Sequence, residues 1–440
     1  MKCLWTTCFL VVGASAAVAA APDYSGRWEI AVREFGQNNY YLPMTDGRLV
    51  IAMADGHATG SFGRLGFSGT LEKDGLHLAC STGGKPCGDL VLRLGKDGLS
   101  GGGFLLGADT VNRFPVTVTG HRPIAKPAAA AMHDFDPREF HPFYSPDLPP
   151  VLHIFPGDSV KTRTADSRGQ DADGQPRAPR GNPQTGPFYV EGAMPGDTLV
   201  VHLDRVRTNR DTAYQGNSIS TNALLPGYLQ SLPKPDSGPG GFATWKIDAA
   251  SGTATLAAPG ERLGNYKIKL QPMLGCIGVA PPRGETLGSG HLGVFGGNMD
   301  FREMREGVTL YLPVFRPGAL LYLGDGHAEQ GDGELPGQGL ETSLDVQFTV
   351  SVMEDKSLGQ PWVEDDTYAM VMGVGTSMDD ALKQATTGMS RWLADTYHLT
   401  PQDIAAVLGT AMQYQIAEVV DSEYDIVAKV RKDALSQIKK

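Results

Sequence analysis

Three stretches decide the fold class: Phe155-Pro-Gly-Asp-Ser-Val160, Met194-Pro-Gly-Asp-Thr-Leu199 and Arg316-Pro-Gly-Ala-Leu-Leu321. In each, proline fixes φ at the first corner of a turn and glycine accepts a positive φ at the second. Each stretch therefore predicts a type II turn that begins a strand. Their unequal spacing argues against a solenoid repeat. Strands that begin in this way favour a mainly β protein with a jelly-roll-like β-sandwich.

The composition agrees with this expectation and excludes some functions. The chain has 440 residues, including 56 glycines and 30 prolines, and its net charge at pH 7 is −11. Hydrophobic cores stop growing near ~250–300 residues, so this length predicts at least two domains. The negative charge argues against a nucleic-acid partner, because proteins that bind nucleic acids present a basic face. No stretch approaches the ~20 apolar residues that would span a bilayer.

The N-terminus has the features of a signal peptide over residues 1–20. Lys2 gives a positive start, and a short apolar stretch from Cys8 to Ala20 ends in small residues. We therefore expect a periplasmic or secreted protein. In such an oxidising compartment, the turn-rich stretch Cys80-Ser-Thr-Gly-Gly-Lys-Pro-Cys87 predicts a disulfide between its two ends. Cys276 has apolar neighbours and is interpreted as a buried hydrophobic residue rather than a nucleophile.

Residues 22–122 are predicted to form a small antiparallel β-barrel or meander with an accessory role. Asp-Gly dipeptides, which readily form tight hairpin turns, separate its strand-like stretches. We expect strands at Arg27–Arg33, Arg48–Met53, Leu76–Cys80, Leu90–Leu94 and Pro115–Gly120. Residues 123–132 are small and interrupted by proline, which is typical of a linker.

Residues 133–440 form the second predicted domain, whose C-terminal portion is α+β. The stretches Ser377-Met-Asp-Asp380 and Thr400-Pro-Gln-Asp403 each have a helix-capping residue followed by an acid in the first turn, so each predicts a helix start. The alternation at residues 426–431 predicts a terminal strand.

One glycine-rich segment, Leu323-Gly-Asp-Gly-His-Ala-Glu-Gln-Gly-Asp-Gly-Glu334, concentrates acidic residues around a single histidine. Such a density of carboxylates is costly unless a cation or shared protons relieve the repulsion. Asp325 and His327 share one face if the segment is extended. One histidine with several carboxylates suits a hard or borderline divalent metal. A solvated acidic loop or a structural Ca²⁺ site remains the alternative.

Five motifs, taken in order, resemble those of the acetamidase/formamidase family, over residues from about 133 to about 432. They are Thr185-Gly-Pro-Phe-Tyr-Val-Glu-Gly-Ala-Met-Pro-Gly-Asp197, Gly278-Val-Ala-Pro281, Gly297-Asn-Met-Asp300, Leu312-Pro-Val314 and the glycine-rich segment at 324–334. The resemblance implies a jelly-roll-like sandwich, a homo-oligomer, and hydrolysis of a short formamide- or acetamide-like amide to a carboxylate and ammonia. Family members often carry histidine where this chain has Asn182.

The residues allow one consistent mechanism. Asp300, Asp325, His327 and Asp332 are the expected ligands of a divalent metal, Zn²⁺ or Ca²⁺, that assists attack by water. Glu191 or Glu334 would move the proton of that water, with His327 beside them. Asn298 and Gln330 would contact the substrate. Because residues 133–440 contain no Gly-x-Ser-x-Gly elbow, metal-assisted attack is favoured over covalent catalysis.

A non-catalytic function stays open on the sequence alone. A secreted β-sandwich that holds Ca²⁺ in its acidic cluster and binds a small polar ligand would share most of these features. Turnover of an amide distinguishes the two hypotheses.

Overall fold

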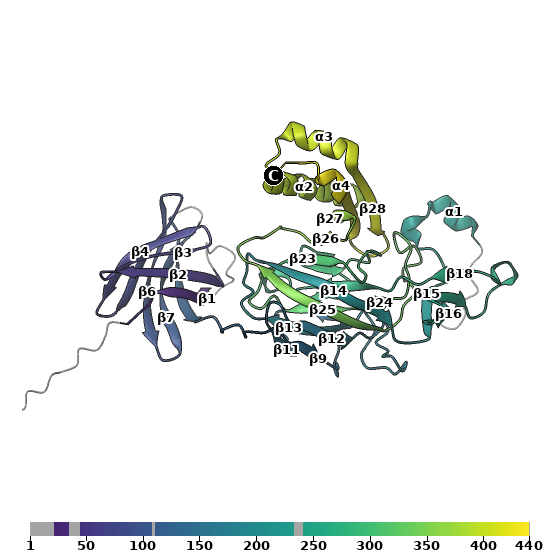
Figure 1. Cartoon of the computed structure of the whole chain (residues 1–440), viewed down its shortest axis with the longest axis horizontal. Helices are drawn as coiled ribbons and strands as arrows, with labels where there is room; N and C mark the ends of the chain where they lie inside the picture. The colour runs from purple at the N-terminus through teal and green to yellow at the C-terminus, as the bar shows by residue number, and fades with distance from the viewer. Residues whose placement is uncertain (1–21, 35–44, 108–110, 233–240, 440) are drawn as a thin grey trace, which may run out of the picture.

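The computed structural model describes residues 22–34, 45–107, 111–232 and 241–439. The expected signal peptide lies outside the described residues. The protein is mainly β, and Figure 1 shows a barrel at one end, a sandwich in the middle, a smaller lobe at the far end and a helical portion above the sandwich. No helix among the described residues is both long and apolar enough to cross a bilayer.

The N-terminal unit is a closed barrel in which each strand pairs antiparallel with its neighbours and the first strand pairs with the last. Its core contains the fully or almost fully buried side chains of Trp28, Leu49, Leu76 and Leu92. The strands are β1 (Gly26–Glu34), β2 (Gly47–Ala54), β3 (His57–Phe62), β4 (Leu65–Glu72), β5 (Gly75–Thr82), β6 (Lys85–Gly95), β7 (Gly98–Leu106) and β8 (Arg113–His121).

The five strands predicted for this unit are confirmed, and three more, β3, β4 and β7, went unpredicted. Strand β7 was not predicted because it is rich in glycine, and its sequence begins Gly98-Leu-Ser-Gly-Gly-Gly-Phe104. A side chain at Gly101 or Gly103 would strike the backbone carbonyls of β6, so glycine permits the close approach of these two strands. Strand propensity alone misses such positions.

Cys80 on β5 and Cys87 on β6 form a disulfide, with their Cα atoms 5.0 Å apart. The bond crosses the hairpin next to a register shift between Cys80 and Ser81. The structure thus contains the pair that the sequence predicted.

The central unit packs two sheets against a common core, as predicted for the sandwich. Phe188, Ile277 and Leu323 come from the smaller sheet, and Val201 and Phe348 from the larger. The smaller sheet is ordered β11 (Leu152–Ile154), β13 (Gln184–Val190), β24 (Leu321–His327), β19 (Met273–Gly278), β22 (Gly296–Asn298), β21 (Leu292–Gly293). The larger is ordered β28 (Met412–Glu418), β29 (Tyr424–Arg431), β27 (Tyr368–Gly375), β26 (Trp362–Glu364), β23 (Thr309–Pro313), β14 (Thr198–Thr208), β25 (Leu344–Met353), β12 (Ser159–Arg163), β9 (Met132–Asp134).

The three Pro-Gly turns lie directly before β12, β14 and β24, so each begins a strand as its sequence predicts. A separate lobe contains a four-stranded sheet and a short helix. Its elements are β15 (Thr212–Gly216), α1 (Pro226–Ser231), β16 (Phe242–Asp248), β17 (Thr253–Leu256) and β18 (Lys267–Lys269). The short strands β10 (Phe143–Tyr144) and β20 (Leu287–Gly288) pair with each other.

The C-terminal portion is α+β, as expected. Its helices are α2 (Met378–Tyr397), α3 (Pro401–Ala411) and α4 (Lys432–Leu435). The Ser377 side chain caps α2 by accepting from the Asp380 N–H, and Thr400 forms a capping box with Asp403 at α3. Helix α2 packs on β27 and β29, so the helical portion is attached to the larger sheet.

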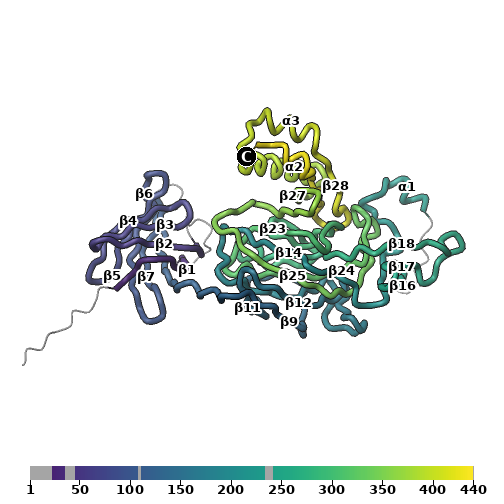
Figure 2. The backbone as a smooth tube through the Cα atoms, viewed as in Figure 1, coloured from purple at the N-terminus to yellow at the C-terminus, as the bar shows by residue number. Residues whose placement is uncertain are grey.

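The barrel is joined to the sandwich by an extended segment and by a buried ion pair. Residues 122–131 have neither helix nor strand and lead into β9, a path that Figure 2 follows. Arg48 on β2 forms an ion pair with Asp197, in the turn that begins β14, and it also donates to the Gly192 carbonyl. Both side chains of the pair are at most 6% exposed, so this contact fixes the barrel against the sandwich.

The C-terminal hairpin buries a pair of carboxyl groups. Glu418 and Asp425 lie opposite each other on β28 and β29, and both are 0% exposed. Burial raises the pKa of Glu418 to about 7, with the charge of Asp421 adding to the rise and backbone N–H groups partly offsetting it. A carboxyl that binds its proton more tightly when folded stabilises the fold only while protonated.

The stability contributed by Glu418 is therefore present below about pH 4.5 and is lost as the pH rises through about 7. We expect Glu418→Gln to raise the free energy of unfolding at pH 8 by about 1–3 kcal/mol relative to its effect at pH 4. Urea unfolding of both proteins at the two pH values measures this difference. Glu285→Gln, in an exposed pair with Arg283, is the control and should show no such pH dependence. Equal effects of Glu418→Gln at both pH values would contradict the prediction.

Candidate active site

The central strands of the smaller sheet bring four distant segments into one row. Cys276 on β19 lies opposite Gly324 of β24 on one side and opposite Asn298 of β22 on the other. Gln184 of β13 lies opposite the same Gly324. This register places Asp325 beside residues that are far from it in the sequence.

A buried group of acidic residues surrounds one histidine at this end of the sheet. We call it the carboxylate–histidine cluster, and its members are at most 6% exposed: Asp300, Asp325, His327, Glu334 and Glu341. Glu341 lies directly opposite His327 in an isolated bridge. Nε2 of His327 is 3.0 Å from Glu341 Oε1, 3.7 Å from Asp325 Oδ1 and 4.0 Å from Glu334 Oε1.

Gln330 sets the orientation of the histidine ring. Its amide nitrogen donates to the backbone carbonyl of Asp300, so its amide oxygen is the group that faces His327 Nδ1, 2.7 Å away. That contact makes Nδ1 an N–H donor to Gln330. Nε2 is therefore the ring nitrogen that faces the carboxylates.

The electrostatics of the cluster are unbalanced. Burial raises the pKa of Asp300, and the charges of Glu334 and Asp325 raise it further. Burial also raises the pKa of Glu334, an effect that His327 partly offsets. Burial by itself would lower the pKa of His327, but the carboxylates of Glu341 and Asp325 outweigh it and raise that pKa. One imidazole cannot balance these carboxylates, so the cluster needs shared protons or a cation.

Four polar atoms of the cluster are buried without a hydrogen-bond partner among the described residues: Asp300 Oδ1, Asp325 Oδ1, His327 Nε2 and Glu341 Oε2. Buried polar atoms are nearly always paired, so each of these requires an explanation. His327 Nε2 is close to Glu341 but not aligned with it for a hydrogen bond. One imidazole nitrogen and three carboxylate oxygens are donors that suit Zn²⁺ or Ca²⁺.

Two sets of donor atoms are close enough to share an ion, with all atoms of a set within 4.8 Å of one another. One set is Asp325, His327 and Glu341, and the other is Asp300, His327 and Glu334. The residues present therefore fit a divalent cation.

Glycine makes room for the cluster at two positions. A Cβ at Gly275 would lie within 2.7 Å of carboxylate oxygens of both Asp300 and Asp325. A Cβ at Gly339 would lie 2.6 Å from His327 Nδ1. Both distances are below van der Waals contact, so larger residues would push the polar side chains apart.

The backbone is strained at the same place. Positive φ angles occur at Asn182 (53°), Asp300 (40°), Asp325 (55°) and Glu334 (47°). Such conformations cost free energy in residues other than glycine, and they concentrate at functional sites.

The structure brings together most, but not all, of the residues predicted for the site. Asp300, Asp325, His327 and Glu334 meet in the cluster. Asn298 is adjacent: its amide donates to Asp300 Oδ2 and Asp421 Oδ2 and accepts from Asn182 Nδ2. Protein groups contact both ends of the Asn298 and Gln330 amides, so these residues position the cluster. Their contact with a substrate stays a prediction.

Glu191 and Asp332 lie elsewhere. Gln184 begins β13, and Glu191 comes directly after the last residue of the same strand. The carboxylate of Glu191 is 2.6 Å from His153 Nδ1. A strand advances ~3.3 Å per residue, which places Glu191 roughly 20 Å along the sheet from the cluster. Asp332 is exposed and accepts a hydrogen bond from Gln415. Two residues apart, Asp332 and Glu334 would share a face in an extended chain. Gly333 and Glu334 have positive φ angles of 81° and 47°, so the loop turns between them and only Glu334 points inward.

Three other residues reach the cluster without having been predicted for it. Glu341 arrives through its bridge with His327, and Asp421 arrives from the C-terminal hairpin. Cys276 is buried, as predicted, but its Sγ is 2.8 Å from Asn298 Oδ1 and 3.7 Å from Asp325 Oδ2. Its apolar neighbours in sequence concealed this polar environment, which depends on strand register.

Asn182 occupies the position where the resemblance suggested histidine. Its amide nitrogen donates to Asp325 Oδ2 over 3.0 Å and to Asn298 Oδ1 over 2.9 Å. This chain therefore presents a hydrogen-bond donor to Asp325 at that position instead of an imidazole.

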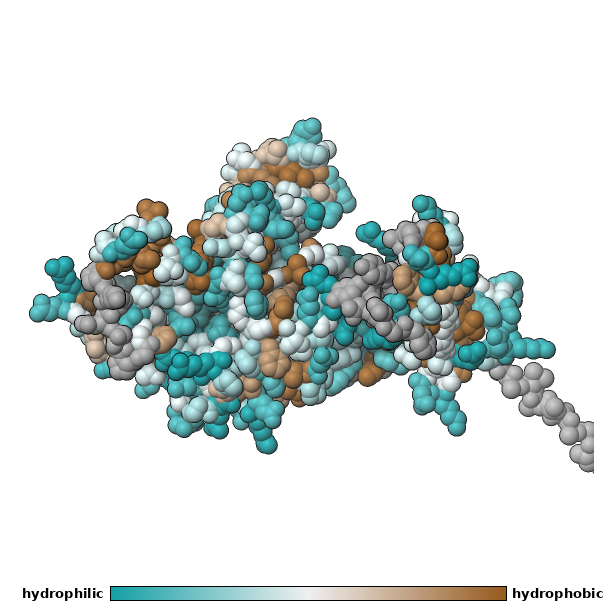
Figure 3. Space-filling view, turned by 180° about the vertical axis from the view of Figure 1, so that it is seen from behind, coloured by the Kyte–Doolittle hydropathy of each residue, from teal (hydrophilic) through white to brown (hydrophobic). Residues whose placement is uncertain are grey.

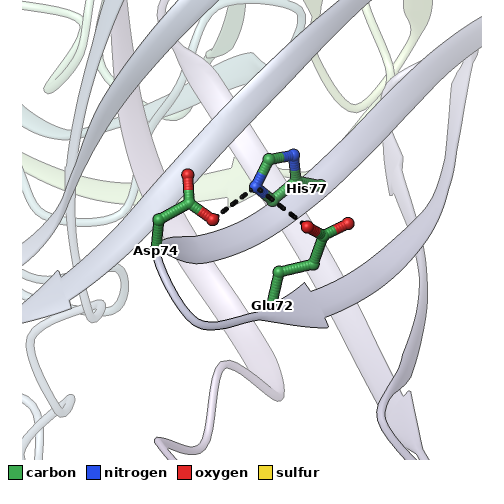
Figure 4. Close-up of side chains that lie close together, drawn as sticks. All are labelled: Glu72, Asp74 and His77. Carbon is green, nitrogen blue, oxygen red and sulfur yellow. Dashed lines mark hydrogen bonds and ion pairs between the residues drawn. The ribbon is translucent and has the colours of Figure 1, made fainter.

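A further group with ligand-type side chains lies on the barrel. Glu72, Asp74 and His77 meet at the β4–β5 hairpin, where His77 Nε2 is 2.8 Å from Asp74 (Figure 4). These side chains are 37–57% exposed, and solvent can balance their charges. We therefore interpret these three residues as a solvent-exposed cluster of charged side chains at a hairpin, not as a binding site.

Comparison with known proteins agrees with the geometry. The profile of the acetamidase/formamidase family matches residues 129–286 and 294–425. The chain belongs to the acetamidase/formamidase family. The match begins after β8, so the barrel lies outside it.

Individual members of the acetamidase/formamidase family have low sequence identity to this chain, but they match it over more than half of its length. The chain is 25% identical to the formamidase of Methylophilus methylotrophus, over 56% of this chain and 74% of that protein. The acetamidase of Bacillus halodurans has a similar structure (TM-score 0.59, 26% identity, 70% of this chain and 100% of that one). The acetamidase of Yersinia enterocolitica is also similar (TM-score 0.61, 25% identity, 71% of this chain and 96% of that one). Membership makes this chain a hydrolase of linear, non-peptide amide bonds.

Proposed function

We propose that this protein is a metal-dependent amidase that hydrolyses a small linear amide to a carboxylate and ammonia. The observation that carries the proposal is the set of four unpartnered buried atoms of the carboxylate–histidine cluster. Family membership supports the reaction, and this geometry supports the involvement of a metal.

Asp325, His327 and Glu341 would hold a divalent cation, with Asp300 beside them. When bound, Zn²⁺ or Ca²⁺ would supply polarisation of the amide carbonyl and acidify the attacking water. Gln330 accepts a hydrogen bond from His327 Nδ1, so Nε2 is the nitrogen that would face the cation.

Glu334 moves the proton. Of the two glutamates considered for this role, it is the one in the cluster, and its Oε1 is fixed by the Gly339 N–H at 2.7 Å. Burial raises its pKa, which brings a carboxyl closer to the range useful for a general base and acid near neutral pH. Glu334 would take the proton from the attacking water and return it to the departing amine.

We also propose where the enzyme is located and how it assembles. The N-terminal signal-peptide features and the Cys80–Cys87 disulfide support a periplasmic or secreted protein. Tyr414 and Ile416, at 46% and 42% exposure on the edge strand β28, support a homo-oligomer that covers this edge.

Ammonia release from a panel of formamide, acetamide and larger primary amides tests the proposal. We expect turnover of at least one amide, loss of activity after removal of metal by a chelator, and recovery with Zn²⁺ or Ca²⁺. Elemental analysis of the purified protein identifies the ion. Metal-replete protein that binds Ca²⁺ tightly but hydrolyses no amide would instead support the non-catalytic binding protein.

A further inference from the structure

A cavity of about 650 Å³ opens beside the cluster. Gln330 and Glu334 line it, so it is continuous with the residues that orient His327 and move the proton. Its walls come from the lobe, through β16 and β18, and from the loop that joins β24 to β25.

The cavity is far larger than the simplest amides require. Formamide and acetamide have three and four non-hydrogen atoms, and a water molecule fills ~30 Å³ of liquid, so such an amide needs on the order of 100 Å³. Sites of 300–1,000 Å³ typically hold molecules of drug size. Most of this cavity would remain empty around acetamide.

Its wall combines apolar and aromatic side chains with the amides of Gln215, Gln271, Gln330 and Gln338. Trp245, which is 4% exposed, packs edge-on against Tyr266 with ring centroids 6.2 Å apart. Ile268 lies on β18, which is separated from the strand of Trp245 by β17, and Leu335 contributes from the loop. Leu335 and Tyr266 are 41% and 51% exposed, so an apolar rim leads in from solvent. Seen from behind in Figure 3, hydrophobic residues reach the surface of this lobe, at the left.

Two carboxylates of the wall already have partners. Glu329 is paired with Arg302 at 3.0 Å, and Asp332 accepts a hydrogen bond from Gln415. Outside the cluster, the cavity therefore favours an uncharged occupant, because a charged one would lose its hydration without a dedicated partner.

We propose that the substrate is a primary amide of a hydrophobic acid with an aromatic-sized acyl arm, and that this arm occupies the cavity. The inference rests on the proposed amidase function and names the substrate class for it. The amide group lies against the cluster, and water attack forms the new C–O bond while the C–N bond breaks. Glu334 passes the proton to nitrogen, so that ammonia leaves.

The test compares kcat/KM for phenylacetamide and acetamide on the full-length, metal-replete protein. Burying a phenyl ring favours the larger amide by about 10- to 100-fold. Leu335→Trp, which fills the rim, should lower this preference about tenfold. Tyr266→Ala removes part of the wall and should lower it too. Leu263→Trp, at a residue of similar exposure that does not line the cavity, should keep it. Thermal melting confirms that each variant is folded.

The outcomes separate the two proposals. A wild-type protein that hydrolyses acetamide as well as phenylacetamide overturns the substrate class and leaves the amidase intact. A preference that neither Leu335→Trp nor Tyr266→Ala changes removes the cavity as its cause. Hydrolysis of no amide overturns the amidase proposal itself.

Discussion

Replacing Glu334 by glutamine should lower kcat/KM for amide hydrolysis by about 10²- to 10⁴-fold, the usual contribution of general acid–base catalysis. Glutamine has nearly the same shape, and its amide oxygen can still accept from the Gly339 N–H. It cannot take up and return a proton. Ammonia release with the best amide of the panel measures the effect, and elemental analysis shows whether the variant keeps its metal.

Glu191→Gln is the matched control, because the same substitution is made at a glutamate that the sequence could not distinguish from Glu334. The carboxylate of Glu191 contacts His153 and not the cluster, so kcat/KM should remain at the wild-type value. Full activity of Glu334→Gln, or an equal loss in both variants, would contradict the assignment. A loss of metal together with activity would make Glu334 a ligand rather than the proton carrier.

Local sequence patterns predicted those features whose cause is local. The Pro-Gly turns before β12, β14 and β24 and the caps at Ser377 and Thr400 depend on a few consecutive residues, and the structure has them all. The glycine-rich strand β7 was not predicted, because its glycines are required by the close approach of the neighbouring strand β6. Propensity carries no information about that neighbour.

The same distinction applies to the site. Asp325, His327 and Glu334 were found because they stand close together in one segment. Glu341 and Cys276 join them only through strand pairing, which sequence spacing does not specify. The roles of Gln330 and Asn298 depended on which groups their amides meet, and this also follows from register rather than from residue type.

The attachment of the barrel gives the second large effect. Arg48→Ala should weaken the docking of the barrel on the sandwich by about 3–5 kcal/mol, because it leaves the Asp197 carboxylate buried without its partner. Asp197 is 0% exposed and, among the residues that the structure describes, would retain the N–H groups of Met194 and Asp355. The pair is thus a structural requirement for one particular arrangement of the two units. Urea unfolding should change from one transition towards two, and the exposed segment at 122–131 should be cleaved faster by protease.

Arg27→Ala provides the comparison within the same interface. Arg27 pairs with Glu354 at 2.9 Å, but the two side chains are 35% and 50% exposed. Solvent screens such pairs, so its removal should cost at most about 1 kcal/mol and leave the unfolding transition single. If Arg48→Ala and Arg27→Ala behave alike, the barrel is held by its other contacts. If only Arg48→Ala separates the transitions, the buried ion pair of Arg48 and Asp197 holds the barrel in place. The activity of that variant then shows whether catalysis depends on the docked barrel.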